Sequence, residues 1–286
     1  MISSTGLLFA FLTAILFTSY GLLARVLSAK SESPLAFSVL FNVWATVLAA
    51  GILLIEPWKF GDLSPLVLFI TFLATLFFGL YAGCEYFMRK HLEASRSTIF
   101  FQLTPVITFI GSVALLAETV SYEKVIALAL IIGGNIVAIY KHGGAITRLG
   151  VIFAFGTIAG LGFAYIADKA VFAEYPLGLY VMITYFFPGL YVFFVLLLRK
   201  EPLRYFKIEW QRMSWRLPVL AVVGVAGYYF MLKTFSLMEV SVAVPITYSS
   251  TVLTALGGIV ILRERGSVIQ KLLGASLVFA GVVLLA

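Results

Sequence analysis

The chain has 286 residues, of which 62% are hydrophobic and only 12% are charged. A soluble globular domain of this size needs more polar surface than these residues supply, so the composition excludes that class and indicates an integral membrane protein. The formal net charge of +7 does not indicate a nucleic-acid partner, because most basic residues lie at the ends of apolar stretches, where they meet lipid headgroups.

Ten apolar stretches follow one another along the chain, and each is long enough to cross a bilayer as a helix. They cover residues 4–25, 34–55, 66–88, 97–116, 125–140, 149–168, 176–198, 217–238, 241–262 and 267–286. Continuous apolar runs predict helices rather than alternating barrel strands. The predicted fold class is therefore an all-α integral membrane protein with ten transmembrane helices. The first stretch lacks a basic leader and a clear cleavage site, so we interpret it as a retained helix.

The sequence resembles itself at an offset of 144 to 146 residues. Residues 6–13 (GLLFAFLT) match 150–157 (GVIFAFGT), and Glu56-Pro57 is echoed by Glu201-Pro202. Further matches keep the same order in both halves, among them Ser95 with Ser241, Gly111 with Gly257 and Glu118 with Glu264. Because each copy crosses the membrane five times, the second must be inverted relative to the first. We place the two repeats at 1–145 and 146–286.

The loops predict the orientation. The odd-numbered loops hold 16 of the Lys and Arg residues and the even-numbered ones hold 4. Positive charge is retained on the cytoplasmic side, so we expect both termini outside, in a cytoplasmic (inner) membrane. The seventh loop, residues 199–216, places Leu203, Phe206, Trp210 and Met213 at helical spacing among basic residues. This pattern predicts a short interfacial helix on anionic lipid, with an irregular basic loop as the alternative.

Two stretches of the chain resemble each other and a known signature. One runs from Ala94-Ser95 through Thr104-Pro105 to Glu118, and the other from Val240-Ser241 through Gly257 to Glu264. They resemble the paired signature of the EamA family in the drug/metabolite transporter superfamily. The resemblance covers the whole chain and implies two inverted five-helix repeats around a central cavity, lined by the first, third, fourth, sixth, eighth and ninth helices. It also implies that the substrate is an amino acid, another small metabolite or a cation, often exported in exchange for protons.

Polar side chains inside apolar helices cost free energy unless they are paired or hydrated, so each is a candidate for lining a path. The candidates for substrate binding or coupling are Asn42, Trp44, Tyr81, Glu85, Gln102, Tyr185, Tyr228, Tyr229, Lys233 and Tyr248. Asn135 is a further polar residue of this kind. Most aromatic residues of the chain are expected to pack or to meet lipid.

Glu85 is the first functional candidate, because we place no other acidic residue well inside an apolar stretch. Its carboxylate could bind a cation or carry a proton. Arg89 lies four residues later, so an ordinary i,i+4 ion pair is the alternative. Lys233 could reach the interface with its long stem, or act at a gate. Inversion puts it on the opposite side of the cavity from Glu85, so we do not expect the two to pair.

The remaining candidates have roles that packing could equally explain. Tyr228 and Tyr229 lie at the middle of an apolar stretch, where they could offer a hydroxyl or a ring face to a ligand. Gln102 and Tyr248 are equivalent at the 146-residue offset, and we expect both to face the cavity. Glu118 and Glu264 close the signature helices, and we interpret them as anchors of the helix ends.

Enzyme motifs are missing from the sequence. The two histidines, His91 and His142, lie at helix ends, and no HExxH, GxSxG or paired membrane aspartates occur. Cys84 is the only cysteine, so we expect no disulfide, metal or cofactor. We expect a monomer or homodimer that is a secondary active transporter of a small polar or amphipathic metabolite, with protons as a coupling ion. A passive facilitator or channel is the alternative, and an intramembrane enzyme is a distant third.

Overall fold

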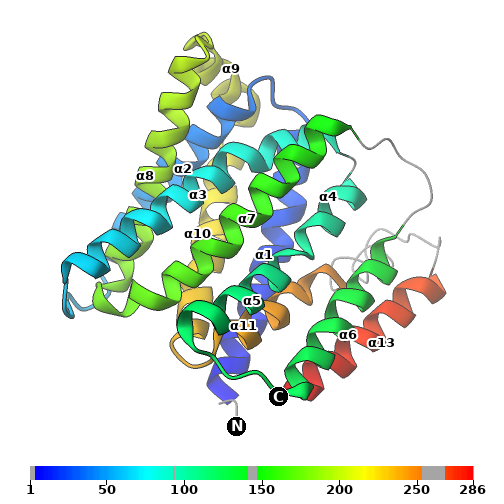
Figure 1. Ribbon diagram of the computed structural model, residues 1–286. Helices are drawn as coiled ribbons and strands as arrows, with labels where there is room; N and C mark the ends of the chain where they lie inside the picture. The colour runs from blue at the N-terminus through cyan, green and yellow to red at the C-terminus, as the bar shows by residue number, and fades with distance from the viewer. Residues whose placement is uncertain (1–3, 93, 141–146, 253–267, 286) are drawn as a thin grey trace.

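The computed structural model describes residues 4–92, 94–140, 147–252 and 268–285, and every regular element in these ranges is helical (Figure 1). The helices of the first half are α1 (Ser4–Ser28), α2 (Pro34–Ile52), α3 (Pro65–His91), α4 (Ala94–Phe101), α5 (Thr104–Leu116) and α6 (Tyr122–Ile139). Those of the second half are α7 (Arg148–Val171), the short 3-10 helix η1 (Phe172–Glu174), α8 (Leu177–Leu198), α9 (Arg204–Met213), α10 (Arg216–Phe235), α11 (Val240–Tyr248) and α13 (Val268–Leu285).

In the described parts of the chain, eight helical segments are long and apolar enough to cross a membrane, so this is a multi-pass membrane protein. Two further apolar helices, Val240–Val252 and Ile269–Leu285, are shorter. The all-helical prediction is confirmed, whereas the count of ten spans stays a prediction. The predicted boundary after residue 145 lies outside the described residues.

The predicted fourth stretch is interrupted rather than continuous. It divides into α4 and α5, with Gln102 and Leu103 between them. Pro105 has no N–H to donate to the carbonyl of Phe101, and its ring would clash with that carbonyl in a continuous helix. The backbone therefore tightens, with Gln102 N–H donating to Ile99 O and Leu103 N–H to Phe100 O.

The two halves run in opposite directions. Both termini lie at one end of the molecule, and α1 starts there, whereas α7 starts at the other end (Figure 1). The packing follows the same symmetry, because α7 packs on α3 and α5 just as α1 packs on α10 and α11. Each copy's first helix therefore packs on the other copy, as an intertwined inverted duplication requires.

Glycine allows two helix–helix contacts, of α7 with α3 and of α6 with α13, to be very close. A Cβ on Gly160 of α7 would lie 2.7 Å from Tyr81 N and 2.8 Å from Phe77 O, so the backbones of α7 and α3 touch. Gly134 of α6 and Gly274 of α13 similarly face each other's carbonyl oxygens, with a Cβ at 2.6 and 2.5 Å respectively. Small residues at such crossings are the usual basis of close helix packing in membranes.

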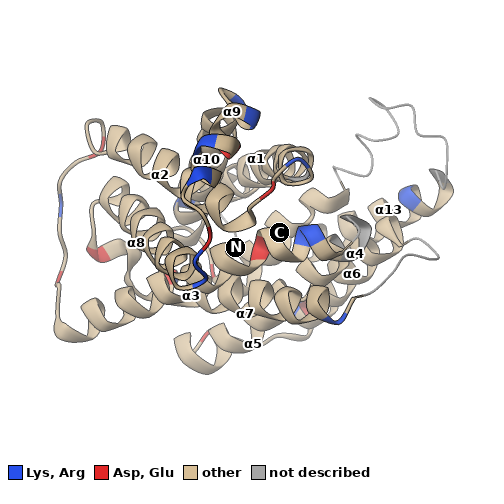
Figure 2. Ribbon diagram, turned by 90° about the horizontal axis from the view of Figure 1, so that it is seen from above, with Lys and Arg blue, Asp and Glu red and all other residues tan. Residues whose placement is uncertain are grey.

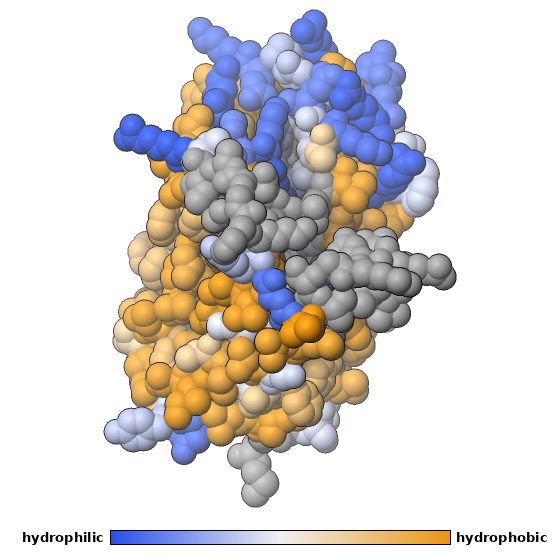
Figure 3. Space-filling view, turned by 90° about the vertical axis from the view of Figure 1, so that its right-hand side faces the viewer, coloured by the Kyte–Doolittle hydropathy of each residue, from blue (hydrophilic) through white to orange (hydrophobic). Residues whose placement is uncertain are grey.

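Most of the lysine and arginine residues that the structure describes gather at one end of the molecule. We call this end, formed by the α1–α2 connection and the ends of α3 and α8 with α9, the basic face, and the end bearing both termini the terminal face. Figure 2 looks onto the basic face and shows Lys and Arg on α9 and at neighbouring helix ends. A hydrophilic band caps this end, with an apolar surface below it (Figure 3). Which face is cytoplasmic stays a prediction.

The seventh loop forms a helix, α9, as predicted, and the irregular alternative is wrong. Met213, the last residue of α9, is buried. Trp210 stacks on Trp44 of α2 with ring centroids 5.7 Å apart. The carboxylate of Glu209 is also buried, and it accepts hydrogen bonds from the backbone N–H groups of Glu32 and Ser33 at 2.7 and 3.0 Å. The α9 helix thus holds the start of α2 in place.

Candidate functional site

Glu85 lies in the interior, one to two turns before the end of α3, and is only 1% exposed. Arg89, one turn later, donates to its Oε1 from Nε at 3.0 Å and from Nη2 at 2.8 Å. The Tyr20 hydroxyl of α1 lies 3.4 Å from Oε2 and 3.1 Å from the Tyr86 hydroxyl. The i,i+4 ion pair that the sequence offered as the alternative is therefore present, and a role of Glu85 in binding a cation or carrying a proton stays a prediction.

A second interior carboxylate, Asp168 of α7, is fully buried. The hydroxyl of Tyr180 in α8 donates to its Oδ1 at 2.8 Å, and the hydroxyl of Tyr228 in α10 donates to its Oδ2 at 2.9 Å. Across the ranges that the structure describes, no cationic side chain forms an ion pair with Asp168. The two tyrosine hydroxyls are thus the groups that solvate this carboxylate in place of water.

The sequence interpretation missed Asp168, and the statement that Glu85 alone lies well inside a span was wrong. The predicted sixth stretch ended at residue 168, whereas α7 continues to Val171 and η1 to Glu174. An aspartate at the end of an apolar run looks like the polar residue that ends a membrane span. The available signal was the residues that follow it, because Ala170, Val171 and Phe172 continue the apolar pattern.

A row of aromatic rings connects the two carboxylates, and we call it the aromatic path: Tyr20, Phe41, Tyr185 and Tyr228. Successive ring centroids lie 5.6, 6.0 and 5.8 Å apart, within the range of direct aromatic contact. Tyr20 reaches Glu85 at one end, and Tyr228 reaches Asp168 at the other. The rings come from α1, α2, α8 and α10, so each inverted copy contributes two of them.

Gln102 lies at the break between α4 and α5 and is fully buried. Its Nε2 donates to Thr251 Oγ1 at 2.8 Å, and its Oε1 accepts from Asn135 Nδ2 at 2.8 Å. The same Asn135 amide donates to Tyr248 O at 3.1 Å. The predicted equivalents Gln102 and Tyr248 are thus brought together in a polar network that joins the two signature regions.

Three other predicted residues are not among the rings of the aromatic path. Asn42 donates to Ser38 O in its own helix, at 2.8 Å. The Trp44 ring packs on α9, as described above. Tyr81 lies one turn before Glu85 and is half-buried. Whether any of these residues contacts substrate stays a prediction.

Tyr229 and Lys233 belong to a separate cluster at the terminal face. The Lys233 Nζ lies 3.3 Å from Oε1 of Glu56, in the α2–α3 connection, and the Tyr229 hydroxyl donates to the same oxygen. The hydrogen bond from Tyr229, supported by the charge of Lys233, holds the pKa of Glu56 below its usual range. Lys233 and Glu85 are not paired, as the inversion predicted.

Glu118 anchors a helix end across the two copies, as we interpreted it. Its two carboxylate oxygens accept from Val240 N and Ser241 N at 2.8 and 2.9 Å, at the start of α11. These N–H groups have no partner within the helix and attract negative charge. Its equivalent, Glu264, lies outside the described residues.

Two adjoining segments of the chain, residues 4–140 and 148–286, each match the sequence pattern of the EamA-like transporter family. The chain belongs to the EamA-like transporter family. The resemblance to the drug/metabolite transporter superfamily is thereby confirmed, and the members of this EamA family are membrane transporters of small solutes rather than enzymes. The two matched segments correspond to the two inverted halves that the EamA-like chain shows in its packing.

One solved structure, titled only "Crystal structure of protein", is 18% identical to this EamA-like chain, with a TM-score of 0.71 over 98% of both chains. At that identity the likeness concerns the fold alone. No curated protein matches the chain.

Proposed function

We propose that this EamA-like protein is a secondary active carrier that moves a small polar or amphipathic metabolite, amino acid-like or cationic, across the cytoplasmic membrane. The observation that supports this proposal is the aromatic path with a buried carboxylate at each end. Aromatic faces attract cations and apolar groups alike, and carboxylates attract positive charge. A solute with an amino group and an apolar body fits both kinds of surface.

The two carboxylates differ in the charge they leave available. Arg89 neutralises Glu85, whereas the donors to Asp168 among the described residues are hydroxyl groups. A buried carboxylate that lacks a cationic partner favours the binding of a positive charge, either a proton or the cationic group of a substrate. We therefore assign Asp168 as the residue at which substrate and proton compete, and this competition would couple their movements.

Alternating access would follow from the inverted packing. The aromatic path is built from both copies, so rocking one copy against the other separates Tyr20 and Phe41 from Tyr185 and Tyr228. The close crossing of α7 on α3 at Gly160 provides a smooth surface for such a movement. A substrate shifts the populations of the two states only through its different affinity for each of them.

The decisive experiment is transport in vesicles that contain the purified protein and a proton gradient. A panel of labelled amino acids, quaternary amines, nucleosides and sugars is tested for accumulation against its own gradient. The carrier proposal predicts uphill accumulation of at least one solute and its exchange with unlabelled solute. A flux that only runs downhill, with no exchange, would support the passive facilitator or channel instead.

The coupling role of Asp168 is tested in the same vesicles with Asp168→Asn. This change keeps a polar group for Tyr180 and Tyr228 but removes the charge. We expect proton-driven accumulation to fall at least about tenfold, the loss of one strong charged interaction. Asp62→Asn is the matched control, since it makes the same change at an exposed position of the α2–α3 connection and should leave accumulation unaltered. Full accumulation by Asp168→Asn would refute the coupling role.

A further inference from the structure

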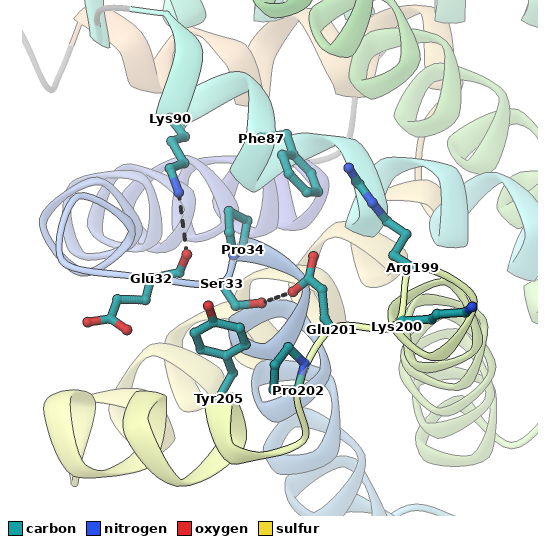
Figure 4. A pocket seen from close by; sticks show the side chains of 10 residues that line it. All are labelled: Glu32, Ser33, Pro34, Phe87, Lys90, Arg199, Lys200, Glu201, Pro202 and Tyr205. Atoms are coloured by element: carbon teal, nitrogen blue, oxygen red, sulfur yellow. Dashed lines mark hydrogen bonds between the residues drawn. The ribbon is translucent and has the colours of Figure 1, made fainter.

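A cavity of about 400 Å³ opens at the basic face, away from the aromatic path (Figure 4). It lies where the start of α2, the end of α3, the end of α8 and the α8–α9 connection meet. We call it the basic pocket, after the cationic residues Lys90, Arg199 and Lys200 in its lining. None of the roles discussed above uses it.

The charged contacts of the pocket decide which ligands it can bind. In the described portion of the chain, Lys90, Arg199 and Lys200 form no ion pair. Lys90 Nζ reaches only the carbonyl oxygen of Glu32, at 3.4 Å, and the Arg199 guanidinium lies 5.3 Å from the Phe87 ring centroid.

The acidic groups of the lining are, in contrast, already engaged within the protein. Glu201 Oε2 accepts from Ser33 Oγ at 2.6 Å, a contact drawn in Figure 4, and the Glu32 carboxylate pairs with Arg212. The Ser33 hydroxyl is neutral, so Glu201 keeps its negative charge, and the lining sets the three cationic groups against this one carboxylate. The net charge offered to a ligand is therefore positive. An anion with several oxygen acceptors, such as a phosphate group, matches these three cations.

The backbone at Lys200 supports a use for its side chain. Lys200 has a φ of 54°, the left-handed conformation that follows many helices and that glycine adopts most easily. A lysine is less stable than glycine there, because its Cβ crowds the carbonyl group. The chain nevertheless has a lysine at this position, in the lining of the pocket.

Apolar surface continues directly from the pocket along α8. Leu198, next to Arg199, is 81% exposed, and Phe194 and Val195 on the preceding turn are also exposed. An anionic phospholipid carries both parts of a complementary ligand, a phosphate for the pocket and acyl chains for this surface. A soluble phosphate ester would use the pocket alone.

We propose that the basic pocket binds the phosphate group of an anionic phospholipid, whose acyl chains lie along the last turns of α8. Basic residues at helix ends also complement the helix dipole. That role alone requires neither a shared cavity nor a preference among lipids, so lipid selectivity separates the two explanations.

The test is native mass spectrometry of the purified full chain with phosphatidylglycerol or phosphatidylcholine, which counts the lipids retained. We expect selective retention of phosphatidylglycerol by the unmodified protein. Lys200→Gly preserves the left-handed backbone and should fold at least as well, yet it should bind phosphatidylglycerol about fivefold more weakly, the effect of one basic residue near a charged lipid. The double variant Lys200→Gly/Arg199→Gln should retain phosphatidylglycerol no better than phosphatidylcholine.

The matched control is Lys207→Gln, which removes a charge from an exposed position of α9 outside the pocket. Its retention of phosphatidylglycerol should equal that of the unmodified protein. An equal loss in Lys207→Gln and Lys200→Gly would mean diffuse attraction and would overturn the pocket. Competition by inorganic phosphate or glycerol phosphate as strong as that of the lipid would overturn the lipid assignment. Both lipids binding alike would overturn the proposal altogether.

Discussion

The same carboxylate chemistry occurs in two different environments within this protein. Glu85 is held by a guanidinium and a hydroxyl, whereas Asp168 is held by two hydroxyls. An ion pair in the interior is strongly sensitive to losing one partner, since the other charge is then left buried alone. Changing its partner Arg89 can therefore distinguish a structural role of Glu85 from a functional one.

We expect Arg89→Gln alone to destabilise the protein by about 3–5 kcal/mol, because it leaves the buried Glu85 charge unpaired. The double variant Glu85→Gln/Arg89→Gln should recover most of this loss. Thermal unfolding in detergent measures both effects. If the double variant is stable but does not transport, Glu85 acts on substrate or protons; if it is stable and transports normally, the pair is structural.

The cluster of Glu56, Tyr229 and Lys233 predicts a dependence of stability on pH. The folded-state pKa of Glu56 is lowered, so its contribution is present above the pKa of the unfolded chain and is lost as pH falls through the folded pKa. We expect Glu56→Gln to cost roughly 0.2–1 kcal/mol at neutral pH. Its unfolding temperature should converge on that of the unmodified protein below about pH 4. A difference that stays constant as the pH falls well below about 4 would contradict this ionic role.

At the scale of elements, the backbones of α7 and α3 come close together where Gly160 has no side chain. We expect Gly160→Ala to destabilise the protein by about 1–3 kcal/mol, because the new methyl group meets backbone atoms that cannot move aside. Gly133→Ala in α6 is the control. A Cβ there meets nothing within 4 Å, so it should be neutral or stabilising by up to about 1 kcal/mol. Equal unfolding temperatures for the two variants would argue against the close crossing.

Elements whose formation depends on continuous apolar length could be predicted from the sequence. The helices α2 and α8 lie within the expected stretches, and α10 begins one residue before its own. The spacing of Trp210 and Met213 indicated α9. The break at Gln102 was missed, although Pro105 was visible, because a proline in a membrane helix can also be accommodated by a kink. The aromatic path could not be predicted, since contacts such as Phe41 with Tyr185 depend on helix packing between the two copies.

At the scale of the whole molecule, the uneven distribution of basic residues predicts the orientation. We expect the basic face to be cytoplasmic. In a Cys84→Ser background, Lys207→Cys on α9 should react with a membrane-impermeant maleimide only after the cells are permeabilised. Lys59→Cys, in the α2–α3 connection, should react in intact cells. The reverse pattern of labelling would place both termini in the cytoplasm.

The network around Gln102 has a consequence for leakage of solute through the protein. The side-chain amide of Gln102 bridges Thr251 and Asn135, and Asn135 also donates to the Tyr248 carbonyl. The signature regions of both copies therefore share one network of hydrogen bonds. Neither region can shift without straining the other. An opening at both ends at once would dissipate any stored gradient, and it would require these buried hydrogen bonds to break together.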